Sequence, residues 1–312
     1  MTRILITGAA GMVGSALLAE LARTSHEVIA CDVQAPEELP ANARFHPMDV
    51  TTDAPLRVIA RYQPDVIVHL ASVVTPPKDS TREMAYAVDV VGTRSVVTAA
   101  LAAGTKRLVI TSSGAAYGYH ADNPVPLRES DDIRGNAEFA YAHHKRLVEE
   151  FLAEVRHNAP FLEQVVLRVG TVLGRRTDNQ ITDLFHKPRL LAVQGSDSPF
   201  VFVWNRDLAR ILLRAATDGP AGIYNVAGDG ALSVDDLSDM MGKPVLRLPA
   251  WLLRTALAVA RPLGLSQYGP EQVSFLQYRP VLSNTALKRD FGYTPEKSSR
   301  EVFEFWHRNQ RS

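Results

Sequence analysis

The chain begins with MTRILITGAAGMVGSALLAELA (residues 1–22), where an apolar run, 3–7, precedes three glycines and a stretch with helical apolar spacing. Glycine is unfavourable inside helices and strands, so Gly8, Gly11 and Gly14 need a structural reason. A plain strand-to-helix loop usually needs one glycine, whereas a tight turn that brings bare backbone against a ligand needs several. Free amides at the start of the following helix can hold a pyrophosphate. The candidate cofactor-binding residues of this loop are Gly8, Gly11, Met12, Val13 and Gly14.

Composition limits the classes of function. Hydrophobic residues make up 46% of the 312 residues, as in globular proteins with one large domain or two joined ones. The 34 basic and 34 acidic residues balance, which argues against a nucleic-acid partner. Cys31 is the single cysteine, so an intrachain disulfide is excluded and a reducing, cytoplasmic compartment is favoured. The histidines show no metal-ligand spacing, and we expect no metal.

The most apolar late stretch is PAWLLRTALAVARPLGL (249–265). Arg254 and Arg261 interrupt it and Pro262 ends it, so it is too short and too charged to span a bilayer. We expect a helix packed on the domain, with a role at a membrane surface as the alternative.

Short apolar runs alternate with segments of helical spacing in the first half of the chain. The predicted strands are 3–7, 27–31, 65–70, 107–111 and 163–168, and the predicted helices are 12–24, 54–62, 83–103 and 138–157. This alternation predicts an α/β fold with a doubly wound, parallel, Rossmann-type sheet over 1–170. The rest, 171–312, predicts a smaller, mostly helical substrate-binding lobe packed closely on the first domain. SVDDL (233–237) reads there as a capped helix start, with further helices at 249–262 and 298–309.

Asp32 ends the second predicted strand, 18 residues after Gly14. A carboxylate there can accept hydrogen bonds from a ribose diol and would repel a 2′-phosphate, so we expect NAD rather than NADP. The alternative is a solvated aspartate at a strand end.

Together these features resemble the extended short-chain dehydrogenase/reductase family, which includes NAD-dependent epimerases and dehydratases. The matching motifs are, in chain order, TGAAGMVG (7–14), PMDVT (47–51), HLAS (69–72), VDVVGT (88–93) and GYTPEKS (292–298). The resemblance implies that Asp49 and Val50 contact the adenine and that Leu70, Ala71 and Ser72 lie beneath the cofactor. Asp89 departs from the family pattern, because asparagine is usual at its position.

YAHHK places Tyr141 and Lys145 four residues apart, on one face of a helix. A phenol is a poor base at neutral pH, but a neighbouring ammonium favours the phenolate. By resemblance, Tyr141 is the general acid/base of hydride transfer with NAD, and Lys145 also binds the nicotinamide ribose. TSSGAAYG (111–118) follows a strand, and the resemblance makes Ser113, rather than Ser112, the hydroxyl that orients the substrate oxygen. A surface Tyr/Lys pair is the alternative reading.

The substrate class depends on two departures from nucleotide-sugar enzymes. Thr171 lies where such enzymes have an asparagine, and Phe200 lies where an arginine is usual, although Arg206 or Arg175 could substitute. These substitutions favour an NAD-dependent dehydrogenase/reductase that acts on a secondary alcohol or ketone, with Thr171, Phe200 and Ser113 at the substrate. The alternatives are a nucleotide-sugar 4-epimerase acting on a UDP-sugar and a non-catalytic NAD-binding regulatory protein. The helices 83–103 and 138–157 lead us to expect a homodimer.

Overall fold

The centre of the protein is a seven-stranded parallel sheet, in a computed structural model that describes residues 1–74, 81–175, 177–266 and 269–310. The spatial order is β10-β6-β5-β4-β1-β2-β3. The bounds are β1 (Arg3–Thr7), β2 (Glu27–Asp32), β3 (Ala43–Pro47), β4 (Val66–His69), β5 (Arg107–Ser113), β6 (Glu163–Val169) and β10 (Gly222–Val226). The inner strands are almost continuously buried, as expected when helices cover both faces.

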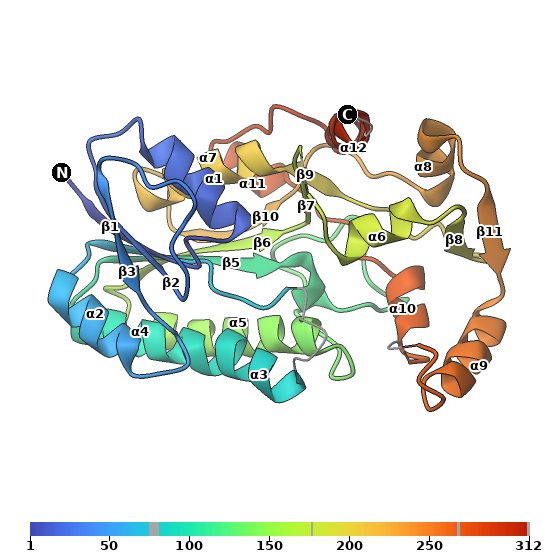
Figure 1. Ribbon diagram of the computed structural model, residues 1–312, viewed down its shortest axis with the longest axis horizontal. Helices are drawn as coiled ribbons and strands as arrows, with labels where there is room; N and C mark the ends of the chain where they lie inside the picture. The colour runs from blue at the N-terminus through green and yellow to red at the C-terminus, as the bar shows by residue number, and fades with distance from the viewer. Residues whose placement is uncertain (75–80, 176, 267–268, 311–312) are drawn as a thin grey trace.

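Helices cover the two faces of this sheet (Figure 1). One face carries α1 (Met12–Leu21), α7 (Asn205–Ala216) and α11 (Thr285–Arg289), and the other carries α2 (Ala54–Tyr62), α4 (Thr93–Ala102) and α5 (Ala140–Asn158). The expected doubly wound α/β fold is therefore confirmed.

The predicted helix 83–103 is divided into three parts. It consists of α3 (Arg82–Tyr86), a π-helical segment (Ala87–Gly92) and α4. By length and composition alone this stretch could cross a membrane, but half of its most apolar window is buried. Val90, Val96 and Val97 pack into the core beneath the sheet, which accounts for its apolar sequence.

The chain leaves the sheet at residue 170, the expected domain boundary, and later returns to it. Strand β10 pairs with β6, and α7 packs against α1. Both elements lie within the range 171–312 that we assigned to the second lobe. The alternation of strand and helix is not visible there because the excursion into the lobe separates β6 from β10.

The C-terminal lobe is mixed rather than mostly helical. It contains two parallel strand pairs, β7 (Thr171–Leu173) with β9 (Phe202–Trp204) and β8 (Leu190–Val193) with β11 (Val245–Leu248). Its helices are α6 (Gln180–His186), α8 (Val234–Met241), α9 (Ala250–Ala260), α10 (Gln272–Gln277) and α12 (Ser299–Asn309). The predicted helix start at Ser233 is confirmed, because Ser233 and Asp236 form a capping box. Phe185, Phe202, Phe303 and Trp306 form the core of this lobe.

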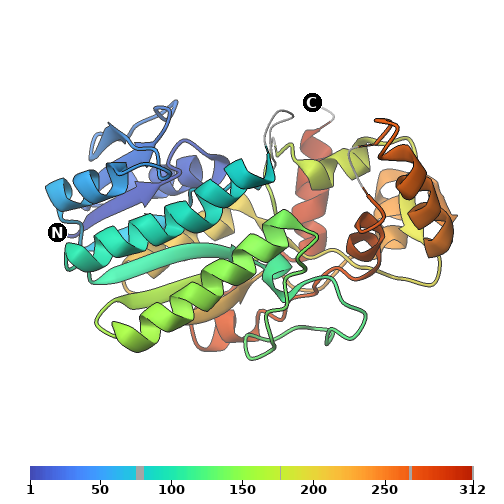
Figure 2. The same cartoon turned by 90° about the horizontal axis from the view of Figure 1, so that it is seen from below.

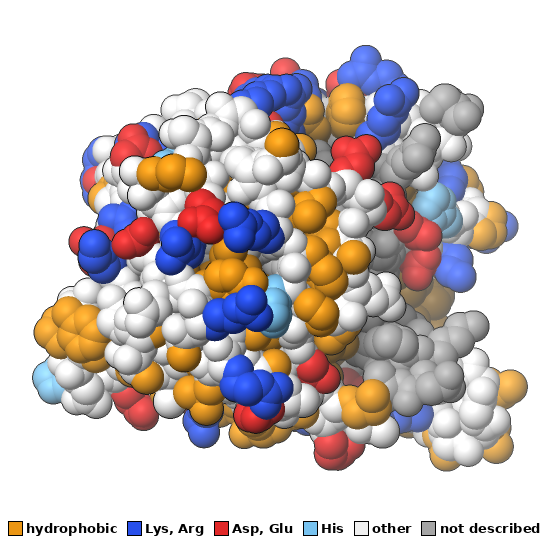
Figure 3. All heavy atoms as spheres, turned by 60° about the vertical axis from the view of Figure 1, so that its left-hand side comes forward, with side chains coloured by type: hydrophobic (Ala, Val, Ile, Leu, Met, Phe, Trp, Pro, Cys, Tyr) orange, Lys and Arg blue, Asp and Glu red, His pale blue; other side chains and the backbone are white. Residues whose placement is uncertain are grey.

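Basic and acidic side chains are interspersed on the face that Figure 3 shows, with hydrophobic side chains between them. The balanced net charge is thus also locally mixed on this face.

Candidate active site

The glycine loop is shaped by close backbone contacts. Gly8 has φ +70°, and a Cβ there would lie 2.7 Å from the amide nitrogen of Ala71. A Cβ on Gly14 would lie 2.3 Å from the carbonyl oxygen of Gly8. A Cβ on Gly11, by contrast, would meet only that same oxygen, at 3.4 Å. At Gly8 and Gly14 the turn is packed too closely for a side chain. Gly11 leaves the approach to the N-terminus of α1 open, and such an open helix N-terminus suits a pyrophosphate.

Asp32, at the end of β2, is fixed against this loop. Its Oδ2 accepts a hydrogen bond from the Ala10 amide at 3.0 Å, and Oδ1 accepts one from the Val33 amide at 2.7 Å. The carboxylate is thus held beside the glycine turn, where the sequence predicts that the adenosine ribose binds.

The predicted adenine segment divides into an exposed and a buried residue. Asp49 is exposed and accepts hydrogen bonds from the Thr51 amide and hydroxyl at 2.9 and 2.7 Å. Val50 is buried against the π-helical segment, since a Cβ on Gly92 would lie 2.6 Å from its Cγ2. The side chain of Val50 therefore belongs to the core, and its backbone is the part left for a ligand.

The segment after β4 is tied to β1. The hydroxyl of Thr7 accepts hydrogen bonds from the amides of Leu70 and Ala71, each at 3.2 Å. Thr7 and Thr93 also hold the buried His69 at 2.7 and 2.8 Å. Burial, with the charge of Lys145 added, lowers the pKa of His69 to about 3, so this imidazole is neutral at physiological pH.

Asp89 joins that segment to the helix that carries Tyr141. Its buried carboxylate accepts hydrogen bonds from the Ser72 hydroxyl and the Val73 amide, both at 2.8 Å, and lies 2.9 Å from Nδ1 of His144. Burial opposes its ionisation, but the hydrogen bonds and the charge of Lys145 lower the pKa of Asp89 overall. We did not predict His144, although its position next to Lys145 places it on the inner side of α5.

Tyr141 and Lys145 lie on α5 beside the end of β5. The ammonium of Lys145 donates a hydrogen bond to the carbonyl of Thr111 at 2.9 Å and lies 5.5 Å from the centre of the Tyr141 ring. Lys145 is buried, whereas Tyr141 is half-buried. The ammonium is thus held by the sheet at a distance where its charge reaches the phenol.

The two serines after Thr111 have different partners. Ser112 is buried and donates a hydrogen bond to Glu149 at 2.5 Å. Ser113 is half-buried, and its hydroxyl accepts a hydrogen bond from the Ala115 amide at 3.1 Å. Within the described part of the chain no acceptor takes the proton of the Ser113 hydroxyl, which supports choosing Ser113 over Ser112.

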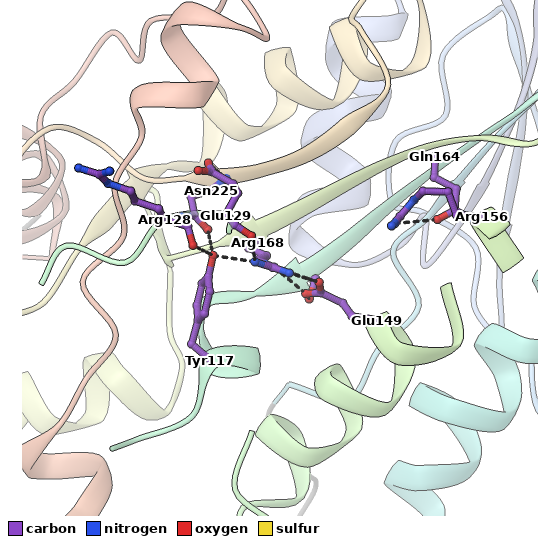
Figure 4. Close-up of polar contacts among 9 residues, drawn as sticks. Tyr117, Arg128, Glu129, Glu149, Arg156, Gln164, Arg168 and Asn225 are labelled. Atoms are coloured by element: carbon purple, nitrogen blue, oxygen red, sulfur yellow. Dashed lines mark hydrogen bonds and ion pairs between the residues drawn. The ribbon is translucent and has the colours of Figure 1, made fainter. Parts of the chain in front are cut away.

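A buried polar network joins α5, β6 and β10 (Figure 4). Arg168 on β6 donates to both carboxylate oxygens of Glu149 on α5, from Nε to Oε1 at 3.1 Å and from a terminal nitrogen to Oε2 at 2.7 Å. Its other terminal nitrogen donates to the Tyr117 hydroxyl at 2.8 Å, and that hydroxyl lies 2.8 Å from Oδ1 of Asn225 on β10. Burial opposes the charge of Arg168, but Glu149 raises its pKa above the ordinary value. We did not predict this network, although an arginine within the apolar run of β6 is a signal for a buried ion pair.

Comparison with known proteins shows which family has this sequence pattern. The pattern that defines the NAD dependent epimerase/dehydratase family matches residues 4–227. The chain belongs to this family. The UDP-glucose 4-epimerase of Mycolicibacterium smegmatis is 31% identical over 247 residues, which cover 70% of this chain and 74% of that protein.

Solved structures of similar proteins share the fold over the whole chain. The Bordetella bronchiseptica enzyme WbmG, in complex with NAD and UDP, has a TM-score of 0.75 at 21% identity, covering 99% of this chain and 94% of its own. The UDP-glucose 4-epimerase of Thermotoga maritima, with UDP-glucose, has a TM-score of 0.75 at 19% identity, covering 99% and 98%.

The predicted substrate residues have structural partners within the lobe. Thr171 begins β7 and is half-buried, and its amide donates to the carbonyl of Val201 at 3.2 Å. Phe200 is buried in the core of the lobe and stacks on Phe202. Trp251, by contrast, is exposed.

The arginines that could replace a missing phosphate contact are engaged elsewhere. Arg206 lies 3.6 Å from Glu20 on α1, and Arg175 donates to Asn309 at 3.1 Å. Both side chains are exposed, and each makes its contact at the surface.

Arg279 is the guanidinium that we did not predict. It lies over the ring of Phe200, 3.8 Å from its centre, and donates to the Ser198 carbonyl and hydroxyl at 2.7 and 2.9 Å. Its Nε is buried without a hydrogen-bond partner, and no carboxylate pairs with it among the residues that the structure describes. Burial lowers the pKa of Arg279 to about 9, opposed by Tyr119. An arginine this poorly compensated fits an anionic ligand.

Within the described parts of the chain, no group of three or more His, Cys, Asp or Glu side chains could hold a metal ion.

Proposed function

We propose that the protein is an NAD-dependent epimerase of a nucleoside-diphosphate sugar, the reading that the sequence ranked second. Arg279 carries this proposal, because the preference for a non-nucleotide substrate rested in part on Phe200 lying where an arginine is usual, and Arg279 lies over the Phe200 ring. The names of the relatives, UDP-glucose 4-epimerases among them, support the same choice.

Aromatic contacts link Arg279 to the catalytic helix. Arg279 lies over Phe275, 5.1 Å from the ring centre, and Phe275 contacts Tyr119 edge-on at 5.2 Å. Tyr119 in turn contacts Phe139, the residue before α5, at 4.9 Å. These contacts form a continuous path from Arg279 to the start of α5, the helix that carries Tyr141.

In this proposal the chain holds the cofactor with its glycine loop and Asp32, and supplies the acid–base groups. When bound, NAD would supply a hydride acceptor for the sugar carbon and the donor for the return of that hydride. Tyr141 takes the proton from the hydroxyl on that carbon and gives it back to the resulting carbonyl oxygen. Lys145 favours the phenolate, and Ser113 donates a hydrogen bond to the reacting oxygen. An epimerase of this kind would invert that carbon with no net consumption of NAD.

The test is turnover of UDP-glucose and UDP-galactose, each with NAD, followed by chromatography of the sugar nucleotides. We expect interconversion without accumulation of NADH. Tyr141→Phe should retain NAD binding and lose about 10²–10⁴-fold in turnover. Tyr62→Phe, the same change on the distant α2, is the matched control and should keep full activity.

A second variant tests the substrate class. Arg279→Met should weaken UDP binding by roughly 10–100-fold, since a charged hydrogen bond contributes about 1.5–3 kcal/mol. Stoichiometric NADH from apolar secondary alcohols, with no UDP-sugar turnover, would instead favour the dehydrogenase. Binding of NAD without turnover of either class would favour the regulatory protein.

We further propose a cytoplasmic location. Cys31 is a buried free thiol on β2, and burial raises its pKa to about 12, so it is protonated and unreactive.

A further inference from the structure

Helix α9 is exposed on most of its surface. Of its eleven residues, all of which the structure describes, only Leu253 is buried. Trp251 is 67% exposed, and Leu263 and Leu265, in the turn after the helix, are 66% and 78% exposed. Large apolar side chains gathered in this way at a surface mark an interaction site.

The exposed apolar residues share one side of α9. At 100° per residue, Ala258, Trp251, Val259, Leu252 and Ala256 cover an arc of roughly 160°. Arg254 and Arg261, seven residues apart, both lie at one border of this arc. The other side of the helix packs on the lobe through Leu253 and Leu257, so the exposed arc, which also contains Thr255, is a second apolar side with cations at one edge.

The charged residues of the segment 249–266 are all basic. Arg254 and Arg261 are the only charged residues in 249–266, and the next acid is Glu271. Glu271 lies 3.4 Å from Arg261, and the amide oxygen of Gln277 lies 3.3 Å from Arg254. Both arginines are exposed, so they can reach an anionic surface beyond the apolar arc.

The helix also lies at a free end of the molecule. Figure 1 shows α9 at the opposite end from β1–β3, and Figure 2 shows the orange helices of the lobe at that same end. A flat surface can approach this end without meeting the Rossmann domain.

From these observations we propose that α9 and the turn after it, residues 250–265, dock the protein on an anionic lipid bilayer, with the helix lying in the interface. Eleven residues are too few to span a bilayer, but an apolar side bordered by arginines suits the boundary between acyl chains and headgroups. Trp251 is the residue type that favours this boundary. A second copy of the chain fits less well, because a two-fold contact would add two more arginines to a segment without a carboxylate.

The test is co-sedimentation of the full chain with vesicles of phosphatidylcholine, with or without about a third of phosphatidylglycerol. We expect binding to the anionic vesicles, together with a blue shift of tryptophan fluorescence as Trp251 leaves water. The variant Trp251→Ser/Leu263→Ser/Leu265→Ser should reduce partitioning at least ~10-fold. Arg254→Gln and Arg261→Gln should each reduce it about fivefold.

A matched control replaces three exposed apolar residues elsewhere, Leu39→Ser/Leu56→Ser/Phe161→Ser, and should bind vesicles like the unaltered protein. NAD binding shows that each variant is folded. The proposal is wrong if the unaltered protein binds neither kind of vesicle, or if the α9 variant binds as well as the control. It is also overturned if the α9 variant changes only the mass measured by light scattering, which would make this surface a contact between copies.

Discussion

Asp32 combines two roles at the residue scale. It holds the Ala10 amide of the glycine loop, and its charge lies where a ribose would bind. We expect NAD to bind at least ~10-fold more tightly than NADP, because a like-charge contact with a 2′-phosphate costs upwards of about 1.4 kcal/mol. Isothermal titration with both cofactors measures this ratio.

Two variants separate the roles of Asp32. Asp32→Asn keeps an acceptor for Ala10 but removes the charge, so the preference for NAD should shrink. Asp53→Ala removes an exposed carboxylate that is not among the predicted cofactor residues and should leave the preference unchanged. Equal affinity of the unaltered protein for the two cofactors would contradict the role of Asp32.

His69 makes stability depend on pH. Its pKa is about 3 in the folded protein against an ordinary value of 6.5, so between these pH values the unfolded chain binds a proton that the folded chain does not. The free energy of unfolding should therefore fall as pH falls below 6.5, by up to about 1.4 kcal/mol per pH unit. Urea unfolding between neutral pH and pH ~4.5 measures the slope, within the acid range where carboxylates still ionise.

The variant His69→Gln should flatten that slope whatever its effect on stability at neutral pH. His157→Gln, at an exposed position of α5, should keep it. An unchanged slope in His69→Gln would show that other groups cause the pH dependence.

Helix α5 is the element that assembles the site. Tyr141, Lys145 and Glu149 follow one another at intervals of four residues and so share one face. Lys145 contacts the end of β5 through Thr111, and Glu149 contacts it through Ser112. The ion pair of Glu149 with Arg168 therefore helps to hold the face of α5 that carries Tyr141 against β5 and β6.

Removal of one member of this pair leaves a buried charge uncompensated. Glu149→Ala should lower the free energy of unfolding by about 3–5 kcal/mol. Glu150→Ala breaks the exposed pair with Arg146 on the same helix and should cost at most about 1 kcal/mol. Urea denaturation of both variants measures the difference. If Glu149→Ala does not fold, Glu149→Gln is measured in its place. Similar losses of the free energy of unfolding at positions 149 and 150 would contradict the expected role of the buried pair.

At the scale of the whole molecule, α4 and α5 lie side by side across one face of the domain (Figure 2). Met84, Tyr86 and Val91, on the stretch that leads into α4, are exposed apolar side chains. We expect this face to pair two copies, so that light scattering at micromolar concentration gives about twice 34.3 kDa.

The variant Val91→Glu should produce the monomer, because it places a charge in the apolar contact. Leu56→Glu, at an exposed position of α2, is the control and should remain dimeric. A mass of 34.3 kDa for the unaltered protein would show that it is a monomer.

Local sequence determined the strands β1, β2, β4, β5 and β6, the helices between them and the cofactor loop, because hydrophobic periodicity and glycine content act over a few residues. Tertiary structure alone decided which distant groups meet. Asp89 and His144 are 55 residues apart, Arg279 and Ser198 are 81 apart, and β10 joins the sheet after an excursion through the lobe. Such contacts depend on how the completed sheet and lobe pack, which no local pattern records. For this reason we now place a nucleoside-diphosphate sugar above an apolar alcohol as the substrate, because Arg279 meets Phe200 only in the folded chain.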